Sequence, residues 1–420
     1  MNLSRIRSTV AGNLGAKFMR LWQASFTTNL ADGVWLSAGP LLAASLTRDP
    51  LLIAGLVTAQ RLPWLLFSLP SGAVVDRLDR KRIMWIGNAI RASLILALGL
   101  STYYGLLSIY GMYVFFFLLG TVEPFVDNAS FAILPRVVQQ GQLEKANGRL
   151  FATTTVANEL VGPPAGSFLF TLFPPAAFII SSLAYGGAAG LLGTLEGTYL
   201  AQRKPGAATR LLTEIREGLH WFWNHRVLRA LALLVTLQNL VFTAGYSLLV
   251  LYAQDQLGLS ATGYGLLLSM GAIGGLTGAV VSDRAGLRLG TGRVIILGIV
   301  LTGLAFIVLG VSHNTWLAAA MLALNSFSTT MSVTLILALR QTLIPDDLLG
   351  RVTSVYRFIV IGTAPLGSLA GGLLARRYGL EMPYWAGGVL ILLATLLTYR
   401  YIGNQAVEQA KAETSRPATS

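Results

Sequence analysis

Long apolar runs constrain this chain more than any other feature of its sequence. A helix needs about 20 mostly apolar residues to cross the hydrocarbon core of a bilayer, and such runs recur along the whole chain. Charged residues make up only 12% of the 420 residues, whereas a soluble domain carries about a quarter. We therefore predict an all-α integral membrane protein with twelve transmembrane helices, at residues 22–46, 52–74, 83–103, 107–133, 152–173, 176–199, 227–253, 262–282, 293–311, 315–338, 354–375 and 383–402.

A repeated string divides the predicted helices into two halves. GAVVDRLDRKR begins at Gly72 and GAVVSDRAGLR begins at Gly278, and each closes the second helix of a group of six. A second echo follows the fourth helix of each group, in ILPRVVQQGQLEKANGRL and LRQTLIPDDLLGRVTSVYR. Parallel halves with matching loops are typical of transporters built from repeats. We expect two pseudo-symmetric six-helix bundles, over 1–199 and 227–420, the second ending in a short polar tail, with a cytoplasmic linker over 200–226.

Basic residues predict how the chain is oriented in the membrane. Most of its 31 Lys and Arg lie near the two termini and in the loops on the same side of the predicted helices. Cytoplasmic loops carry such an excess, so both termini are predicted to be cytoplasmic. The linker lies on that side too. It is expected to form an amphipathic helix along the membrane surface, because apolar residues recur in it at helical spacing, at Leu211, Ile215, Leu219 and Phe222.

The composition also argues against several classes of function. The net charge of +13 comes from short segments between apolar runs, so we expect no nucleic-acid binding, which uses a basic face or groove. The chain has no Cys and only three His, so we expect no metal site and no cofactor. It has no GxxxxGK[ST] phosphate loop, so ATP is not expected to be its direct source of energy.

Several motifs resemble those of the major facilitator superfamily. The superfamily signature between the second and third helices has a second glycine where this chain has Asp79, and is otherwise matched by Gly72, Asp76, Arg77, Arg80 and Lys81. The phrases RLPWLLFSLPSGAVVDRLDRKR and IPDDLLGRV are similar to the branch of bacterial drug and siderophore exporters that includes the enterobactin exporter group. The resemblance implies the major facilitator fold and a place in the bacterial cytoplasmic (inner) membrane.

Six charged residues fall inside the predicted helices, and all of them lie in the first half. A charge at the centre of a helix in lipid costs at least about 2.5–3.5 kcal/mol, so it is kept where it is paired or functional. Charge handling is therefore expected in the first half, and mostly apolar contacts in the second. The carboxylates are Asp32, Glu123, Asp127 and Glu159, and the bases are Arg61 and Arg91.

Asp32 is the first candidate for carrying protons. It lies on a polar stripe of the first helix, which the resemblance places on the wall of the central cavity. Burial favours the neutral form of a carboxyl group, so such a group can take up and release a proton; the alternative is a structural ion pair with Arg61 or Arg91. Glu123 either shares the proton site or contacts a cationic group. Arg61 is expected to neutralise one of these acids or to bind an anionic substrate. Arg91 lies on a helix that is peripheral in the superfamily, and is expected to be a cytoplasmic-side partner or to extend toward the surface.

Asp127 is expected to act at a different place, the cytoplasmic gate. In the superfamily an acid at this level meets the signature arginine. The resemblance therefore implies a latch between Asp127 and Arg80, backed by Asp76, that closes the cytoplasmic side. The second copy of the signature is degenerate, because a serine lengthens its spacing, and its gate residues are Gly278, Asp283 and Arg284.

A glycine and proline cluster interrupts the fifth predicted helix. Gly162, Pro163 and Gly166 match the Gly-Pro-x-x-Gly core of the signature that the superfamily associates with antiporters. Proline cannot donate a helical hydrogen bond, so the cluster predicts a hinge or a tight seal between the halves. The alternative is ordinary close packing of helices at glycine.

The predicted substrate cavity combines charged, aromatic and amide residues. An apolar cavity with a few amides and an acid suits amphipathic or cationic organic molecules. We predict a monomeric secondary transporter, not an enzyme, that exports such molecules by alternating access and is driven by protons. The alternatives are a siderophore or lipid exporter, a proton-coupled uptake carrier, a transporter-like subunit that does not transport, and a membrane enzyme acting on lipids. The cavity residues are Asp32, Glu123, Arg61, Trp35, Asn239 and Asn325.

Overall fold

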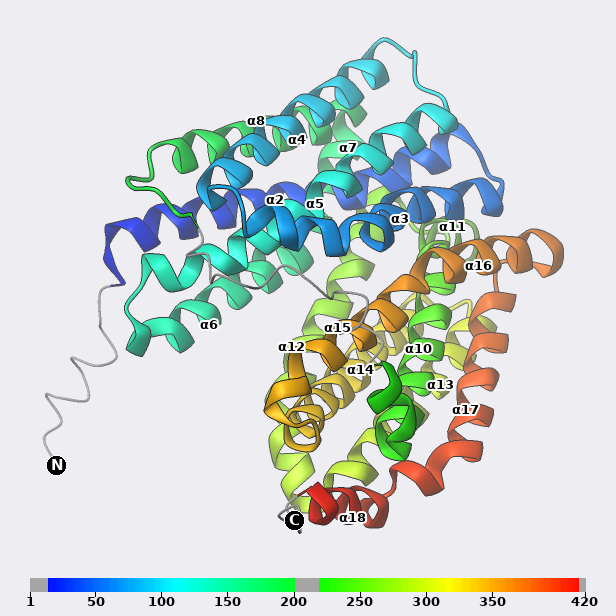
Figure 1. Ribbon diagram of the computed structural model, residues 1–420. Coiled ribbons are helices and arrows are strands. Elements are labelled where there is room, and N and C mark those ends of the chain that lie inside the picture. The colour runs from blue at the N-terminus through cyan, green and yellow to red at the C-terminus, as the bar shows by residue number, and fades with distance from the viewer. Residues whose placement is uncertain (1–13, 201–218, 415–420) are drawn as a thin grey trace, which may run out of the picture.

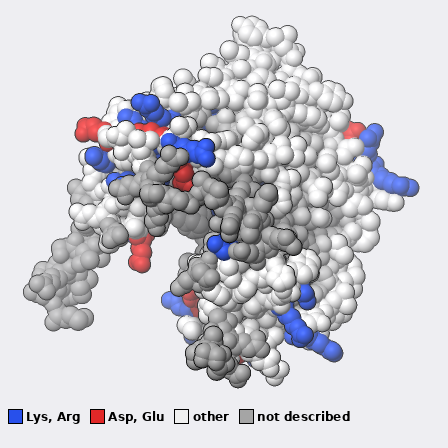
Figure 2. Space-filling model, in the orientation of Figure 1, with Lys and Arg blue, Asp and Glu red and all other residues white. Residues whose placement is uncertain are grey.

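The computed structural model describes residues 14–200 and 219–414, and this part of the chain is helical with no β-strand. Ten of its helical segments are long and apolar enough to cross a membrane. In Figure 2 the charged side chains gather in separate clusters, with wide uncharged surfaces between them. Uncharged surfaces of this kind suit contact with lipid. The predicted helix of the linker falls largely on residues 201–218, which lie outside the described part of the chain.

The first group of helices is built from residues 14–200. Side chains begin two of its helices, since Asp49 Oδ1 accepts a hydrogen bond from Leu51 N at 2.9 Å and Asp79 Oδ1 accepts one from Lys81 N at 2.9 Å. α2 packs against α8 and α7, and α4 packs against α8 and α5. The elements are α2 (Gly15–Leu46), α3 (Pro50–Val75), α4 (Arg80–Tyr103), α5 (Ile109–Val137), the turn η1 (Gln140–Gln142), α6 (Leu143–Thr153), the π-helix η2 (Thr154–Val161), α7 (Gly162–Leu172) and α8 (Pro174–Gly193).

The second group of helices contains the largest buried apolar cluster. α12 packs along α14, and α13 packs against α14 and α17. Its elements are α10 (Arg226–Tyr246), α11 (Leu249–Leu251), the π-helix η3 (Tyr252–Gln256), α12 (Ala261–Leu289), α13 (Thr291–Val311), α14 (Thr315–Leu343), α15 (Asp346–Gly362), α16 (Ala364–Tyr378), α17 (Met382–Ile402) and α18 (Asn404–Thr414).

Two predicted helices end earlier than the sequence pattern indicates. The helix predicted at 176–199 ends at Gly193, and the segment after it is held by tertiary contacts: Tyr199 N donates to Asp79 Oδ2 at 3.4 Å. The helix predicted at 227–253 ends at Tyr246 and continues only as the short α11 and η3. Next to that break, the Tyr384 hydroxyl donates to Gly245 O at 2.7 Å. Both endings depend on distant residues, which local apolar patterns do not encode.

Two other predicted helices extend further than the sequence pattern indicates, and one of them is also divided. The one predicted at 354–375 begins earlier and is divided at Thr363, because Pro365 cannot donate a backbone hydrogen bond. The one predicted at 262–282 runs on to Leu289, so Asp283 and Arg284 are helical and exposed. The second copy of the repeated string therefore extends a helix, whereas the first copy forms the turn between α3 and α4.

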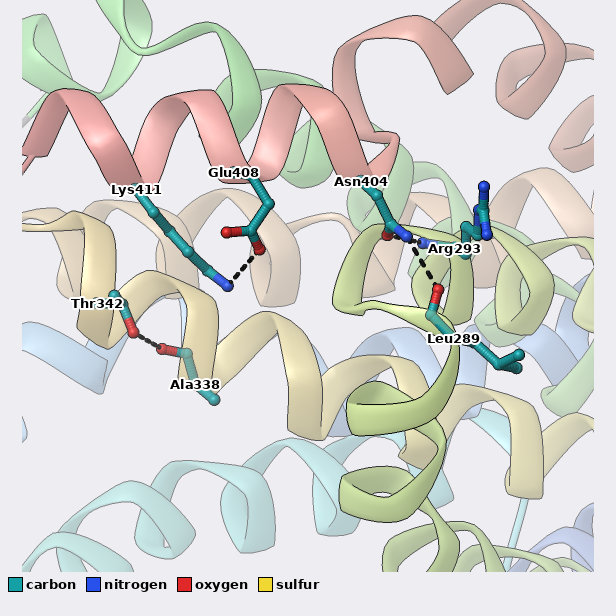
Figure 3. A network of polar contacts seen from close by, with 7 residues as sticks. All are labelled: Leu289, Arg293, Ala338, Thr342, Asn404, Glu408 and Lys411. Atoms are coloured by element: carbon teal, nitrogen blue, oxygen red, sulfur yellow. Dashed lines mark hydrogen bonds and ion pairs between the residues drawn. The ribbon is translucent and has the colours of Figure 1, made fainter.

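The polar tail expected after the last span forms the helix α18, which docks against the second group. Its first residue, Asn404, accepts a hydrogen bond from Arg293 N at 2.9 Å and donates one to Leu289 O at 2.9 Å (Figure 3). Further along, Lys411 Nζ lies 2.9 Å from Glu408 Oε1. The apolar side of the helix is buried at Val407. Its amphipathic pattern thus serves packing against α13 and α14.

The two groups of helices meet along two seams, α3 with α16 and α7 with α12 (Figure 1). Two ion pairs join them at one end of the molecule, where Arg48 Nη1 lies 3.1 Å from Asp255 Oδ1 and Arg376 Nε lies 3.5 Å from Asp49 Oδ2. We call this end, with the loops at 47–49, 257–260 and 379–381, the sealed end. From it the groups diverge toward α6 and α15 (Figure 1).

Candidate transport site

Three of the acids predicted from the sequence line one cavity of about 480 Å³ within the first group of helices. Asp32 comes from α2, and Glu123 and Asp127 come from successive turns of α5. Arg91 of α4 and Tyr185 of α8 complete its charged and polar wall. Its lining residues, within the part of the chain that the structure describes, belong to the first group. We call it the first cavity.

Asp32 is held by two aromatic side chains that donate hydrogen bonds. The Tyr185 hydroxyl donates to Asp32 Oδ1, and Trp35 Nε1 donates to the Tyr185 hydroxyl at 2.8 Å and to Asp32 Oδ1 at 3.4 Å. The indole is itself fixed by an edge-to-face contact with Phe116, at 5.2 Å between ring centroids. The carboxylate therefore has a fixed position on the cavity wall.

Arg91 is the basic residue of this network. The sequence analysis offered it as one of two partners for Asp32, and its burial corrects the other expectation, that it extends toward the surface. Only 4% of its surface is exposed, its guanidinium lies 5.7 Å from the centre of the Tyr185 ring, and it lines the same cavity as Asp32. The reason is that α4 turns the face with Met84, Asn88 and Arg91 inward.

Arg61 was expected to neutralise one of these acids or to bind an anionic substrate, and the structure bears on the first of these roles. Within the described part of the chain it forms no ion pair with Asp32 or Glu123. It does not line the first cavity either, although its neighbour Gln60 does. Of the two bases that the sequence analysis offered as partners of Asp32, Arg91 is the one that lines the cavity with it.

The gate residues of the first signature lie at the turn between α3 and α4. Asp76 and Arg77 are exposed, whereas Arg80 is buried and its Nε has no hydrogen-bond partner among the described residues. Asp127 faces the first cavity, and the described contacts include no ion pair between it and Arg80. The two groups of the predicted latch are therefore apart in this conformation. Lys81 lies in the first turn of α4, and Gly72 lies in the last turn of α3.

The counterpart glycine of the second signature has a packing role. A Cβ atom placed on Gly278 would lie 3.0 Å from the Cα of Phe327, so the backbones of α12 and α14 touch there. Asp283 and Arg284 continue α12 beyond this contact.

The glycines of the Gly-Pro cluster bring three helices together. A Cβ atom on Gly162 would lie 2.6 Å from Gly33 Cα, and one on Gly166 would lie 2.7 Å from Val34 Cα, both on α2. On the opposite side, a Cβ atom on Gly265 of α12 would lie 2.6 Å from Pro163 O. The π-helix η2 directly precedes the cluster. The cluster thus forms a close junction of α2, α7 and α12, across the seam between the two groups.

A second cavity, of about 300 Å³, lies between the two groups of helices. Glu159 of η2 lines it from the first group, and Tyr246 and Asn325 line it from the second. Leu36 and Asn158 line both cavities, so the two cavities border each other. The sequence analysis expected Asn325 and Asp32 to line the same cavity. In the structure they line two neighbouring cavities.

Asn239 is held away from both cavities. Its Nδ2 donates to Val360 O at 2.7 Å, close to the break between α15 and α16. It stabilises a helix junction in this conformation. The structure thus brings Asp32, Trp35 and Glu123 together and separates them from Asn239 and Arg61.

Tyr185 and Asn158 are the site residues that the sequence analysis missed. Tyr185 lies in SSLAYGGAAG, where it is the sole large polar-tipped side chain among small residues. A buried tyrosine hydroxyl needs a hydrogen-bond partner, so this pattern is a usable signal. Asn158 had no such signal, because its position depends on the π-helix.

Two groups of helices that meet at one end, with acids lining a cavity inside the first group, are the arrangement of the major facilitator fold. Solved structures share this fold: the nucleoside transporter NupG covers 92% of this chain and 99% of its own, with a TM-score of 0.70 and 13% identity. A bacterial homologue of the iron transporter ferroportin covers 92% and 98%, with a TM-score of 0.73 and 17% identity.

Comparison with known sequences gives the family. The family model described as "Transmembrane secretion effector" (MFS_3) matches residues 8–418, so the chain belongs to that major facilitator family and is a transporter, not an enzyme. The multidrug efflux pump Tap of Mycobacterium tuberculosis (strain ATCC 25618 / H37Rv) is 25% identical over 419 residues, covering 97% of this chain and 99% of its own. Macrolide efflux protein A of Streptococcus pyogenes is 23% identical over 391 residues, covering 92% and 96%.

Proposed function

We propose that the protein exports amphipathic or cationic organic molecules and takes up protons in return. The export direction rests on the family and on relatives whose names describe efflux of drugs and of macrolides. Proton coupling rests on one observation, the cluster of Asp32, Glu123 and Asp127 in a single cavity with Arg91 as the opposing charge.

The cluster supports a specific way of coupling. When Asp32 is ionised, Arg91 balances its charge beside the Tyr185 hydroxyl. Protonation of Asp32 removes that balance, and the guanidinium is then attracted by Glu123 and Asp127 across the cavity. Because Asp32 is on α2, Arg91 on α4 and both other acids on α5, this change alters which helices are drawn together. A proton at Asp32 thereby biases the balance between two arrangements of the bundle.

The topology that fits this function has twelve membrane crossings with both termini in the cytoplasm. Ten segments meet the length and hydropathy expected of a span; α2, at 32 residues about 48 Å long, and the run α6–η2–α7 supply the other two. In this orientation the sealed end faces outward, and the signature turn with Arg80 faces the cytoplasm. The separation of Asp127 from Arg80 then belongs to a cytoplasm-open state, in which the latch is released.

The remaining features of the proposal concern location and partners. We propose that the protein works as a monomer in the bacterial cytoplasmic membrane, with the lipid bilayer, protons and a small-molecule substrate as its partners.

Flux through reconstituted protein tests the proposal. Proteoliposomes that contain the full chain should concentrate a lipophilic organic cation only while a proton gradient is imposed. Accumulation that survives collapse of the gradient, or no movement of any such cation, would contradict it.

A further inference from the structure

We propose that the second cavity is a binding site for the cationic head of the substrate, with Glu159 as its counter-charge and Asn325 as a donor to a hydrogen-bond acceptor on the same molecule. The proposal rests on the function proposed above and deepens it. It separates the acid that meets the substrate from the acid that carries the proton.

Glu159 has no ion-pair partner among the described residues. It lies in the π-helix η2, lines the second cavity and is accessible there. Among the described residues, no hydrogen bond or ion pair engages its carboxylate. Arg61 and Glu159 both act electrostatically on Tyr246, yet no ion pair joins them. An unpaired charge at membrane depth is costly, and it is retained where it serves function.

Two aromatic rings line the same cavity and can contact the same cation. Phe242 and Tyr246 of α10 are stacked, with 5.4 Å between ring centroids and 20° between planes, and both line the second cavity. Aromatic faces attract organic cations, and the attraction grows as water is excluded. The combination of Glu159 and these rings across the seam suits a lipophilic monocation. Ca²⁺ and Mg²⁺ take six or more oxygen ligands, which one carboxylate does not provide.

Asn325 supplies the second half of the recognition. Only 3% of its surface is exposed, and its amide nitrogen has no hydrogen-bond partner. A buried donor without a partner is destabilising by about 1–3 kcal/mol, and a carbonyl, ether or hydroxyl oxygen of a bound molecule would satisfy it. The wall of the second cavity therefore suits a molecule with one cationic centre and one acceptor oxygen.

The bordering cavities explain how substrate and proton can affect each other. Asn158 is next to Glu159 in η2 and lines both cavities. Its backbone also approaches Gly33, the neighbour of Asp32, so closely that a Cβ atom there would have no room. A cation that draws Glu159 toward α10 therefore moves a segment that touches α2 beside Asp32.

Two probes separate the charge from the acceptor. Tetraphenylphosphonium is a lipophilic cation without an acceptor oxygen, and triphenylphosphine oxide is a neutral molecule with similar rings and one acceptor oxygen. Equilibrium binding to the purified full chain in detergent should show that Glu159→Gln weakens the cation by about tenfold or more and leaves the oxide nearly unchanged. Asn325→Leu should weaken the oxide and leave the cation nearly unchanged.

A matched control shows whether the effect of Glu159→Gln is specific to the second cavity. Glu196→Gln makes the same chemical change at an exposed loop residue and should leave both affinities unchanged. Thermal unfolding and size-exclusion profiles identify any variant that fails to fold, and Glu159→Asp, which keeps the charge, should retain preference for the cation over the oxide.

The outcomes distinguish this site from the proposed function. Equal binding of tetraphenylphosphonium by folded Glu159→Gln and wild type, or no binding of the cation by wild type, overturns the site, even if proton-driven flux is observed. If the Glu159 dependence holds but no gradient drives flux, the site stands and proton-coupled export fails.

Discussion

The contact between Gly265 and the Gly-Pro cluster allows a direct test of how the two helix groups meet. A Cβ atom on Gly265 would lie 2.5 Å from Ser167 Oγ, 2.6 Å from Pro163 O and 2.7 Å from Ser167 Cβ. Ordinary contacts between such atoms are longer by about 1 Å, so Gly265→Ala overpacks this seam. The strain exists only while the seam is closed, because Gly265 is on α12 and the atoms it meets are on α7.

The expected magnitude follows from this geometry. Overpacking costs about 1–3 kcal/mol, whereas the higher helix propensity of alanine acts equally in every conformation and cancels. The ratio of the sealed conformation to one opened at that end should therefore fall by about 5- to 150-fold. Gly186→Ala on α8 is the control, since a Cβ atom there meets nothing within 4 Å.

Distances between spin labels measure this shift. The chain has no Cys, so labels attach only at introduced positions. Leu106→Cys places one in the loop after α4 and Trp316→Cys places the other at the start of α14, where the native residues are 78% and 84% exposed. Gly265→Ala should move the distance distribution toward longer values than wild type, and Gly186→Ala should not. Identical distributions for the two alanine variants would refute the close seam.

Three further predictions concern separate parts of the molecule. Asp76→Asn should strongly reduce substrate flux without loss of folded protein, whereas Asp283→Asn, on an exposed face of α12, should have little effect; normal flux in Asp76→Asn would count against the gate. Arg91→Met should destabilise the protein by about 1–3 kcal/mol because it leaves the partly buried acid Asp32 without its opposing charge, and adding Asp32→Asn should restore part of that loss in chemical denaturation; no restoration would mean that the two residues are not coupled. Asn404→Ala removes two hydrogen bonds, about 0.5–1.5 kcal/mol each, so amide exchange across 404–414 should quicken; unchanged exchange would show that other contacts hold α18.

The sequence was sufficient to predict a helical membrane protein, because each membrane span is a continuous run of apolar residues that can be recognised without knowledge of tertiary contacts. It also located the charged residues of the predicted helices in the first half. Asp32 and Glu123 line one cavity there, and Asp127, which was expected at the cytoplasmic gate, lines the same cavity. Local patterns could not predict which base would join them. Whether Arg61 or Arg91 faces Asp32 depends on the rotation of α3 and α4 within the bundle, and that rotation is set by packing.

The position of the substrate residues was harder to predict for the same reason. Asn325 and Asn239 both lie on helices of the second group, yet one lines a cavity and the other bonds to Val360 O. Helix boundaries that depend on tertiary contacts, such as the end of α8 near Asp79, were also beyond local reading. The π-helix that presents Glu159 leaves no recognisable pattern in the sequence.

The central claim is that Asp32 couples proton uptake to export, and one measurement tests it most directly. Wild-type and Asp32→Asn proteins are reconstituted side by side, and movement of a labelled lipophilic cation is followed with and without a proton gradient. The neutral amide resembles the protonated acid, so the variant should still exchange substrate down its own gradient but should not concentrate it when protons are supplied. If Asp32→Asn concentrates substrate as wild type does, Asp32 is only a structural partner of Arg91 and does not couple protons to export.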